Sequence, residues 1–306
     1  MKIYEEKYPL GSIRNQKTAG IYTDENLYEN LKELAKAIVH DNSFLILVSS
    51  QALSVRTGKT TFTQYMAETW NYIMLKEHGV NLDFSMNNIA FNADDFEKKA
   101  FKLHEDGQKY GVIICDESDD LTGHSLSAEV KKIKRFLRKS GQLNLLMIMI
   151  LPDFFEFPKS IAINRSVALI TVDYGDHFSR GRWKFYDFKS KKKLYIKGKA
   201  FNDYSVQQPS FYGMFAGTQY LVDEQQYKDE KFKDFKEDSE KERSKRVDII
   251  TREYRKKIFF KMLNKFKGKV TQSDMCEVID ITEQTASAWK REKLGDNISN
   301  ELNSEN

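Results

Sequence analysis

Five short apolar runs dominate the middle of the chain and restrict its possible folds more than any other feature. They lie at Phe44–Val48, Asn88–Phe91, Val112–Cys115, Leu145–Leu151 and Val167–Val172. Turn-forming residues bound each run, and segments with helical patterning separate the runs. Strands that alternate with helices are typical of a mainly parallel sheet covered by helices. The sequence therefore predicts an α/β domain.

The first run leads through a loop into a helix that begins near Gly58-Lys59-Thr60. This order is that of a P-loop, in which backbone N–H groups at the helix start attract phosphate, the lysine reaches the β- and γ-phosphates and the hydroxyl binds Mg²⁺. Leu53 stands where the usual pattern has its first glycine. An ordinary helix start is the alternative interpretation. The expected nucleotide contacts are Arg56, Thr57, Gly58, Lys59, Thr60 and Thr61, with Thr60 also a magnesium ligand.

The third apolar run ends in two acids, Asp116 and Glu117. Ligands of parallel sheets bind at the carboxyl ends of the strands, so the acids fall at the expected binding edge. We expect Asp116 to hold Mg²⁺ through water. Glu117 would orient and deprotonate the water that attacks the γ-phosphate, a task that needs a carboxylate within hydrogen-bond reach. A helix-capping pair of acids is the alternative.

A helix, a short strand and a second helix separate the first and third runs, which resembles the additional-strand, catalytic-glutamate division of P-loop ATPases. In that division a polar residue after the next core strand senses the γ-phosphate, and Asp153 occupies this position. Charge on the γ-phosphate in the transition state also calls for an arginine, commonly from a neighbouring subunit. Arg165, Arg138 and Arg135 are the candidates, and Arg165 is preferred because it directly precedes the last core strand.

Four short motifs in order carry a family resemblance: Arg56-Thr-Gly-Lys-Thr-Thr61, Ile113-Ile-Cys-Asp-Glu117, Phe136-Leu-Arg-Lys-Ser-Gly141 and Asn164-Arg165. Together they resemble the FtsK/HerA superfamily, and within it the zonular-occludens-toxin-like ATPases of phages, plasmids and archaeal elements. The resemblance covers about Phe44 to Lys199. It implies a RecA-like ATPase that uses ATP and Mg²⁺, assembles into a homo-oligomeric ring such as a hexamer, and pumps or packages DNA.

The stretch 182–199 alternates aromatic and polar residues around a basic run, which predicts a β-hairpin with a basic tip. It holds 8 Lys/Arg against one Asp. Lys191–Lys193 could contact DNA from such a tip, or form an ordinary solvated turn.

Changes in composition predict the domain boundaries. We expect a lead-in with one amphipathic helix over 1–42, the P-loop ATPase domain over 43–221, a charged linker over 222–248, a small all-α helix-turn-helix domain over 249–294, and a disordered tail over 295–306.

The segment 271–291 resembles a helix-turn-helix of the resolvase or homeodomain-like kind. Its two short helices would join at Ile279-Asp280-Ile281, with Met275, Ile279, Ile281, Ala286 and Trp289 in the shared core. The stretch 241–269 before it carries 12 Lys/Arg against 3 Asp/Glu, which favours salt-dependent binding to phosphates. A solvated helical pair that docks on a protein is the alternative. The predicted DNA contacts are Gln284, Thr285, Ser287, Lys290, Lys256 and Lys257.

Composition narrows the remaining possibilities. The net charge is only +4, so nucleic-acid affinity must come from locally concentrated charge. Two distant cysteines indicate neither a disulfide framework nor a zinc site. The longest apolar run is far below the roughly 18 residues that a membrane span needs. We therefore expect a cytoplasmic protein, in the host cytoplasm if viral.

These observations together favour a DNA-translocating or DNA-packaging ATPase. Two alternatives stay open. One is a DNA-binding regulator or partition ATPase in which the nucleotide acts as a switch, and the other is a terminase-like packaging ATPase without a nuclease.

Overall fold

The computed structural model describes residues 2–3, 21–51, 56–116, 128–175, 181–215, 220–266 and 269–304. The chain divides into two compact units, Met1–Phe232 and Lys233–Asn306. No helix in the described ranges combines the length and the apolar character that crossing a membrane requires.

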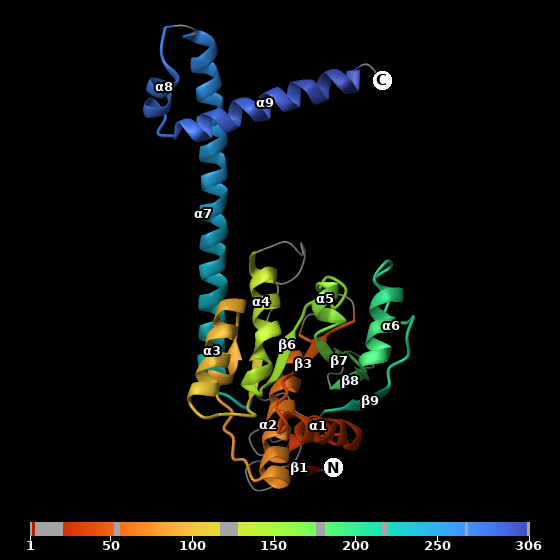
Figure 1. Cartoon of the computed structure of the whole chain (residues 1–306). Coiled ribbons are helices and arrows are strands. Elements are labelled where there is room, and N and C mark those ends of the chain that lie inside the picture. The colour runs from red at the N-terminus through yellow and green to blue at the C-terminus, as the bar shows by residue number, and fades with distance from the viewer. Residues whose placement is uncertain are drawn as a thin grey trace. The chain divides into compact units, whose positions relative to one another are not determined.

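A seven-stranded sheet forms the centre of the first unit (Figure 1). Its strands are β3 (Phe44–Ser49), β4 (Ile89–Ala90), β5 (Val112–Cys115), β6 (Leu146–Ile150), β7 (Ser166–Asp173), β8 (Arg182–Tyr186) and β9 (Phe211–Met214). Their order is β4-β5-β6-β3-β7-β8-β9, parallel from β4 to β7, with β8 and β9 added in antiparallel fashion. β1 (Lys2–Ile3) and β2 (Ile21–Tyr22) pair separately. The predicted mainly parallel sheet is confirmed.

One strand separates the two strands that carry the P-loop motif and the acids. β6 pairs with β3 on one side and with β5 on the other, parallel to both. The next strand along the chain after β5 is thus inserted between β5 and β3, which is the additional-strand arrangement expected from the sequence.

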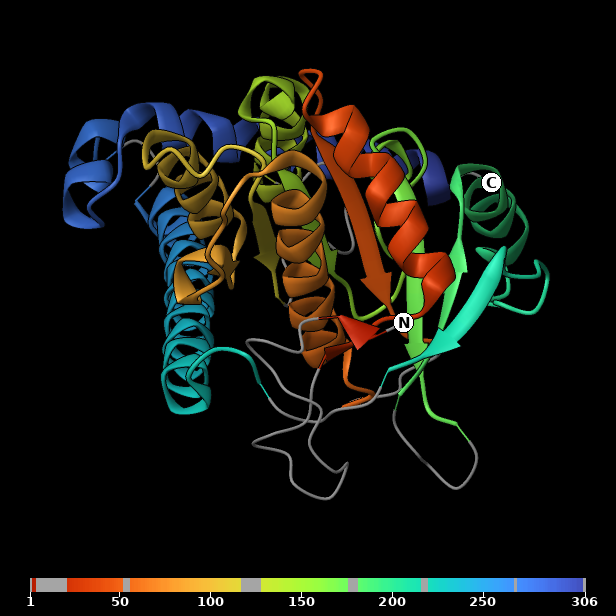
Figure 2. The ribbon, with the colours of Figure 1, turned by 90° about the horizontal axis from the view of Figure 1, so that it is seen from below.

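Helices cover both faces of the sheet (Figures 1 and 2). α1 (Glu25–Ile38) and α2 (Lys59–His78) pack on one face, where Ile46 and Val48 of β3 point. α3 (Ala93–Glu105), α4 (Ala128–Lys139), α5 (Lys159–Ala162) and α6 (Phe188–Gly198) cover the other, where Leu45 and Leu47 point. Because successive side chains of a strand alternate between two buried faces, the central strands are apolar throughout.

The predicted β-hairpin over 182–199 is wrong. β8 ends at Tyr186 and pairs with β9, while the basic run belongs to α6. Asp187 caps this helix by accepting a hydrogen bond from the Ser190 N–H at 2.8 Å. Lys191, expected at an exposed tip, is fully buried and donates to the backbone oxygens of Ile163 and Ser166.

In the second unit the described helices are the later part of α7 (Glu224–Lys265), α8 (Gln272–Val278) and α9 (Glu283–Ser304). α7 runs through the segment 222–248 predicted as a charged linker, and the division between the units after Phe232 falls within this segment. α9 continues to Ser304, into the segment predicted as a disordered tail. Asp280 in the turn between α8 and α9 has a left-handed φ of 52°. The buried core of this unit consists of Phe259, Met275, Cys276, Ile279, Ala286 and Trp289, with Ile281 packed against it.

The buried Lys191 predicts a pH dependence of stability. Burial lowers its pKa from the ordinary 10.5 to about 7, so between these values the unfolded chain holds more protons than the folded chain. Stability therefore rises as the pH rises from 7 toward 10. We expect the free energy of unfolding to gain up to about 2 kcal/mol from this group between pH 7 and 9. Urea unfolding at several pH values measures it.

Lys191→Met should remove this pH-dependent part, and Lys192→Met, a change at the exposed neighbour, should keep it. Equal pH profiles for the wild type and Lys191→Met would contradict the prediction.

Candidate nucleotide site

Three polar side chains follow three adjacent parallel strands at the same edge of the sheet. Ser50 follows β3, Asp116 follows β5, and Asp153 lies three residues beyond the end of β6. The start of α2 lies at this edge as well, because it follows β3 after a single loop. The carboxyl edge of a parallel sheet is where ligands of such folds bind.

The conformation of Gly58 determines how α2 begins. Gly58 has a left-handed φ of +98°, and a Cβ atom there would lie 3.1 Å from Cζ of Phe215. In the described part of the chain no side chain caps the first N–H groups of α2. An uncapped helix start carries free donors and the positive end of the helix dipole, and it attracts phosphate.

The first two residues of α2 connect this helix start to the strand ends. Lys59 Nζ donates to Ser50 Oγ at 3.0 Å, and Thr60 Oγ1 donates to the two carboxylate oxygens of Asp116 at 3.3 and 3.1 Å. Asp116 is only 1% exposed. A hydroxyl and a carboxylate are hard oxygen donors of the kind Mg²⁺ prefers, and Mg²⁺ commonly takes few protein ligands besides the phosphates. The residues present therefore fit the metal that the fold implies.

The other predicted contacts of the loop divide into two groups. Thr57 and Thr61 are buried, at 1% and 7% exposure, whereas Arg56 is exposed and has a left-handed φ of 61°. Glu117 and Leu53 lie outside the described residues.

Asp153, the candidate sensor, is held in place by a tyrosine that the sequence did not single out. Asp153 Oδ1 accepts from the Tyr204 hydroxyl at 3.0 Å and from the Phe155 N–H at 2.9 Å. Burial, together with the nearby Asp153 charge, raises the pKa of Tyr204, so its hydroxyl stays protonated and can donate. Tyr204 lies 51 residues away in the chain, and no local pattern links the two.

A second unforeseen tyrosine contacts Asp116 itself. Tyr227, near the start of α7, is 2% exposed and donates its hydroxyl to Asp116 Oδ2. Burial and the Asp116 charge raise the pKa of Tyr227. Lys231 follows one turn later, with its Nζ 3.9 Å from the same oxygen. These residues fall where the sequence indicated only a charged linker.

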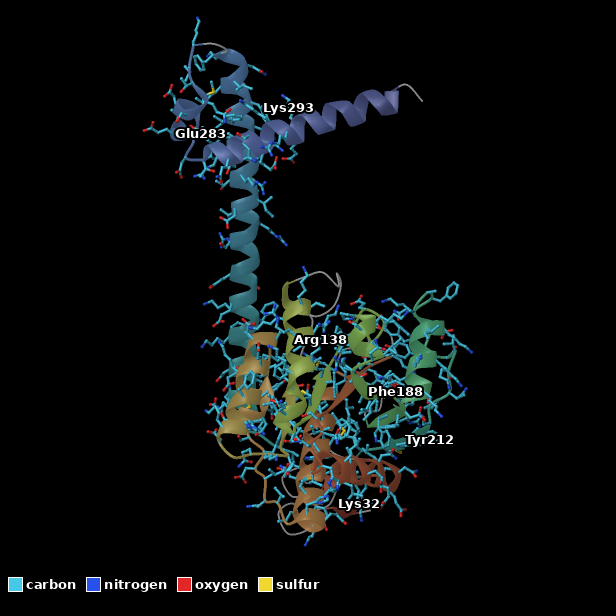
Figure 3. All side chains as sticks on the ribbon, viewed as in Figure 1. Lys32, Arg138, Phe188, Tyr212, Glu283 and Lys293 are labelled. Carbon is cyan, nitrogen blue, oxygen red and sulfur yellow. The ribbon has the colours of Figure 1, made fainter. Side chains whose placement is uncertain are left out.

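Arg165 lies at the amino ends of the parallel strands, whereas the phosphate site lies at their carboxyl ends. It directly precedes β7, whose first residue, Ser166, pairs with Leu45 near the start of β3. Five residues of extended strand separate Leu45 from Ser50, a distance of about 16 Å. Arg165 is exposed. Arg135 and Arg138, near the end of α4 and also exposed, precede β6 and share this edge (Arg138 is labelled in Figure 3).

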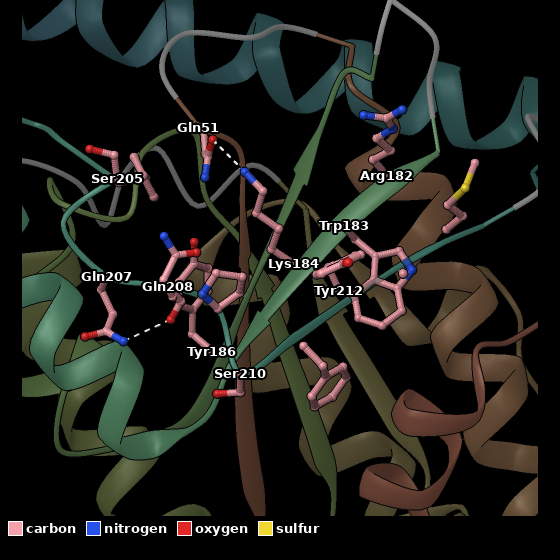
Figure 4. A pocket seen from close by; sticks show the side chains of 15 residues that line it. Gln51, Arg182, Trp183, Lys184, Tyr186, Ser205, Gln207, Gln208, Ser210 and Tyr212 are labelled. Carbon is pink, nitrogen blue, oxygen red and sulfur yellow. Dashed lines mark hydrogen bonds between the residues drawn. The ribbon is translucent and has the colours of Figure 1, made fainter.

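A cavity of about 800 Å³ borders the residue that follows Ser50 (Figure 4). Gln51 lies on its wall and accepts a hydrogen bond from Lys184 Nζ at 3.1 Å, while its backbone N–H donates to Asp173 at 2.7 Å. The rest of the wall comes from β8, β9 and the segment 204–210. Tyr212 of β9 lines it as well and is 75% exposed. Aromatic and amide side chains thus line this hollow.

The predicted DNA contacts of the second unit differ in accessibility. Gln284 and Lys257 are exposed. Lys256 pairs with Glu292 at 3.1 Å, and Lys290 donates to Gln272 Oε1 at 2.5 Å. Ser287 accepts a hydrogen bond from Gln272 at 3.4 Å, and the Thr285 N–H donates to Thr282 at 3.2 Å.

Comparisons with known proteins give structural neighbours only. No protein-family model matches the chain, and no curated protein does. The genome packaging NTPase B204 from Sulfolobus turreted icosahedral virus 2, in complex with ATP-gammaS, is 14% identical over 49% of this chain and 94% of that chain, with a TM-score of 0.35. The N-terminal domain of zonular occludens toxin from Neisseria meningitidis is 13% identical over 61% of this chain and 98% of that chain, with a TM-score of 0.36.

Likeness at this level identifies no family, whereas the strand order and the site geometry define a class. A parallel sheet with β6 between β3 and β5, an uncapped helix start after β3, and a lysine and threonine that face Ser50 and Asp116 are the features of a P-loop nucleoside triphosphatase fold.

The geometry of Gly58 yields a test of the phosphate site. Gly58→Ala would force a side chain into a left-handed conformation against Phe215, at a cost of about 1–3 kcal/mol in unfolding free energy. It should also weaken ATP binding by about tenfold or more, because the helix start and its N–H groups must shift. Isothermal titration and urea unfolding measure the two effects.

Gly79→Ala is the matched control at the other end of α2. Gly79 also has a left-handed φ, +68°, but no atom lies near its would-be Cβ. This variant should lose stability and keep its affinity for ATP. Equal loss of affinity in both variants would show that strain alone is responsible.

Proposed function

We propose that the chain is an Mg²⁺-dependent ATPase that works as a DNA motor. The observation that carries the proposal is the meeting of Lys59 and Thr60, at the uncapped start of α2, with Ser50 and the buried Asp116 at the ends of two strands. A helix start that attracts phosphate, a lysine ammonium and two oxygen ligands suited to Mg²⁺ come together there.

Each residue has a separate task in this proposal. The N–H groups after Gly58 and the Lys59 ammonium bind the β- and γ-phosphates. Thr60 and Asp116 hold Mg²⁺, which when bound neutralises phosphate charge. Glu117 accepts a proton from the attacking water. Asp153, after the end of β6, senses the γ-phosphate.

The position of Arg165 supports a homo-oligomer. Since it lies at the amino edge of the sheet, it can stabilise charge on the γ-phosphate only across a subunit interface. A ring in which each subunit presents Arg165 to its neighbour satisfies this requirement, and hydrolysis would then occur at interfaces.

DNA is the molecule that the proposed motor moves. The motif order resembles that of DNA-pumping ATPases, and the second unit would supply a helix-turn-helix with Gln284 and Thr285 toward the bases. Lys257 on the basic α7 would contact phosphates. A cytoplasmic location, in the host if the chain is viral, accords with this role. A regulator or partition factor, in which nucleotide acts as a switch, and a terminase-like packaging ATPase without a nuclease are the alternatives.

ATP turnover with and without DNA tests the motor. We expect Mg²⁺-dependent hydrolysis that double-stranded DNA stimulates. Lys59→Ala should weaken ATP binding about 10- to 100-fold through loss of charged hydrogen bonds. Glu117→Gln should keep binding and lower turnover by about 100-fold or more. Arg165→Ala should lose turnover, and mixing it with Glu117→Gln should restore part of it if the arginine acts across subunits.

Other outcomes would favour the alternatives. Nucleotide binding with slow turnover that DNA does not change would favour the switch. Normal turnover in Lys59→Ala or Glu117→Gln would overturn the proposed site.

Removal of the residues after Asp248 tests the DNA-binding unit. DNA affinity should fall while DNA-independent hydrolysis persists, because the first unit retains every proposed nucleotide contact. In the full chain, Lys257→Ala should lower the slope of log affinity against log salt by about one. Lys36→Ala, on α1 and 53% exposed, is the charge-matched control. Unchanged DNA affinity after truncation would contradict the helix-turn-helix hypothesis.

A further inference from the structure

The first turns of α7 are packed directly beside the carboxylate of the proposed metal site. The ring of Tyr227 contacts those of Phe91 and Tyr220, with centroid distances of 5.4 and 4.9 Å. Met86 and Ile89 complete this buried cluster. The packing fixes the ring, so its hydroxyl points at Asp116 Oδ2, to which it donates.

The same helix also brings a positive charge to this carboxylate. Lys231 Nζ is 3.9 Å from Asp116 Oδ2 and 3.4 Å from the Tyr227 hydroxyl. Thr60 Oγ1 approaches from the other side, at 3.1 Å from Oδ2. One carboxylate oxygen is thus shared by the first turn of α2 and two successive turns of α7.

We infer that Tyr227 and Lys231 tie the docking of α7 to the occupancy of the metal site: Tyr227 is a positioning residue for Asp116, and Lys231 is a counter-charge that a bound divalent cation replaces. The inference rests on the proposed function, in which Asp116 receives Mg²⁺.

The two residues act on cation binding with opposite signs. A hydrogen bond to a ligand carboxylate fixes its orientation and strengthens metal binding. An ammonium beside the same oxygen repels an incoming cation and weakens binding. When the cation is bound, Lys231 loses its attraction to Asp116, and the first turns of α7 are held less tightly.

Binding of a fluorescent non-hydrolysable ATP analogue, titrated with Mg²⁺, separates these effects. Tyr227→Phe should require about tenfold more Mg²⁺ and leave binding in EDTA unchanged. Lys231→Gln should require about threefold less, as expected for removal of a partly exposed charge. Tyr220→Phe keeps the ring contact, and Lys228→Gln removes an exposed charge that pairs with Glu224. Both controls should match the wild type.

Hydrogen exchange supplies a second readout that does not depend on turnover. In the wild type, amides of 224–232 should exchange faster with the Mg²⁺-bound analogue than with the analogue in EDTA. In Tyr227→Phe they should exchange fast under both conditions.

Two results would overturn the inference. One is an unchanged Mg²⁺ requirement in both variants together with metal-independent exchange of 224–232. The other is an equal rise in the Mg²⁺ requirement in both, which is what a loss of packing alone would produce. If instead Lys59→Ala binds the analogue as well as the wild type, the proposed nucleotide site fails and the inference fails with it, so the two failures are distinguishable.

Discussion

The hydrogen bond from Thr60 to Asp116 is the contact on which the proposed site depends. It joins the start of α2 to the end of β5, although β6 lies between β5 and the strand that precedes α2. The contact at 3.1 Å requires that β3, β6 and β5 end at a common level and that Gly58 adopts a left-handed turn. The buried carboxylate then becomes available to a metal, to Tyr227 and to Lys231.

The parallel sheet also separates the candidate nucleotide contacts from Arg165, because they lie at opposite ends of the strands. Side chains that would bind nucleotide follow strands, whereas Arg165 precedes one and lies at the far edge. The turn that carries Arg165 is anchored by the buried Lys191, which donates to the carbonyl oxygens of Ile163 and Ser166 on either side of it. Strand direction alone thus places Arg165 and the phosphate site at opposite ends of the strands.

The five central strands were predictable because burial on both faces leaves an apolar run that contrasts with its neighbours. The helix over 188–198 was mistaken for a hairpin because its lysine run was taken for a solvated turn. Lys191 in fact lies on the buried face of that helix with Leu194 and Tyr195. The capping bond from Ser190 to Asp187, a short-range signal, could have indicated the helix. Composition alone did not distinguish a helix from a flexible segment over 222–248, because both are rich in charged residues; the structure has α7 there.

Sequence by itself determined the α/β class, the Gly58-Lys59-Thr60 motif and the placement of Asp116 after a strand, because each follows from local pattern and chain order. Tertiary structure alone decided that Tyr204 would hold Asp153 and that Tyr227 and Lys231 would reach Asp116. The two tyrosine contacts join residues 51 and 111 positions apart, and Lys231 contacts Asp116 from a similarly distant part of the chain. The reason is physical: such pairs are set by strand order and helix packing, which no local spacing encodes.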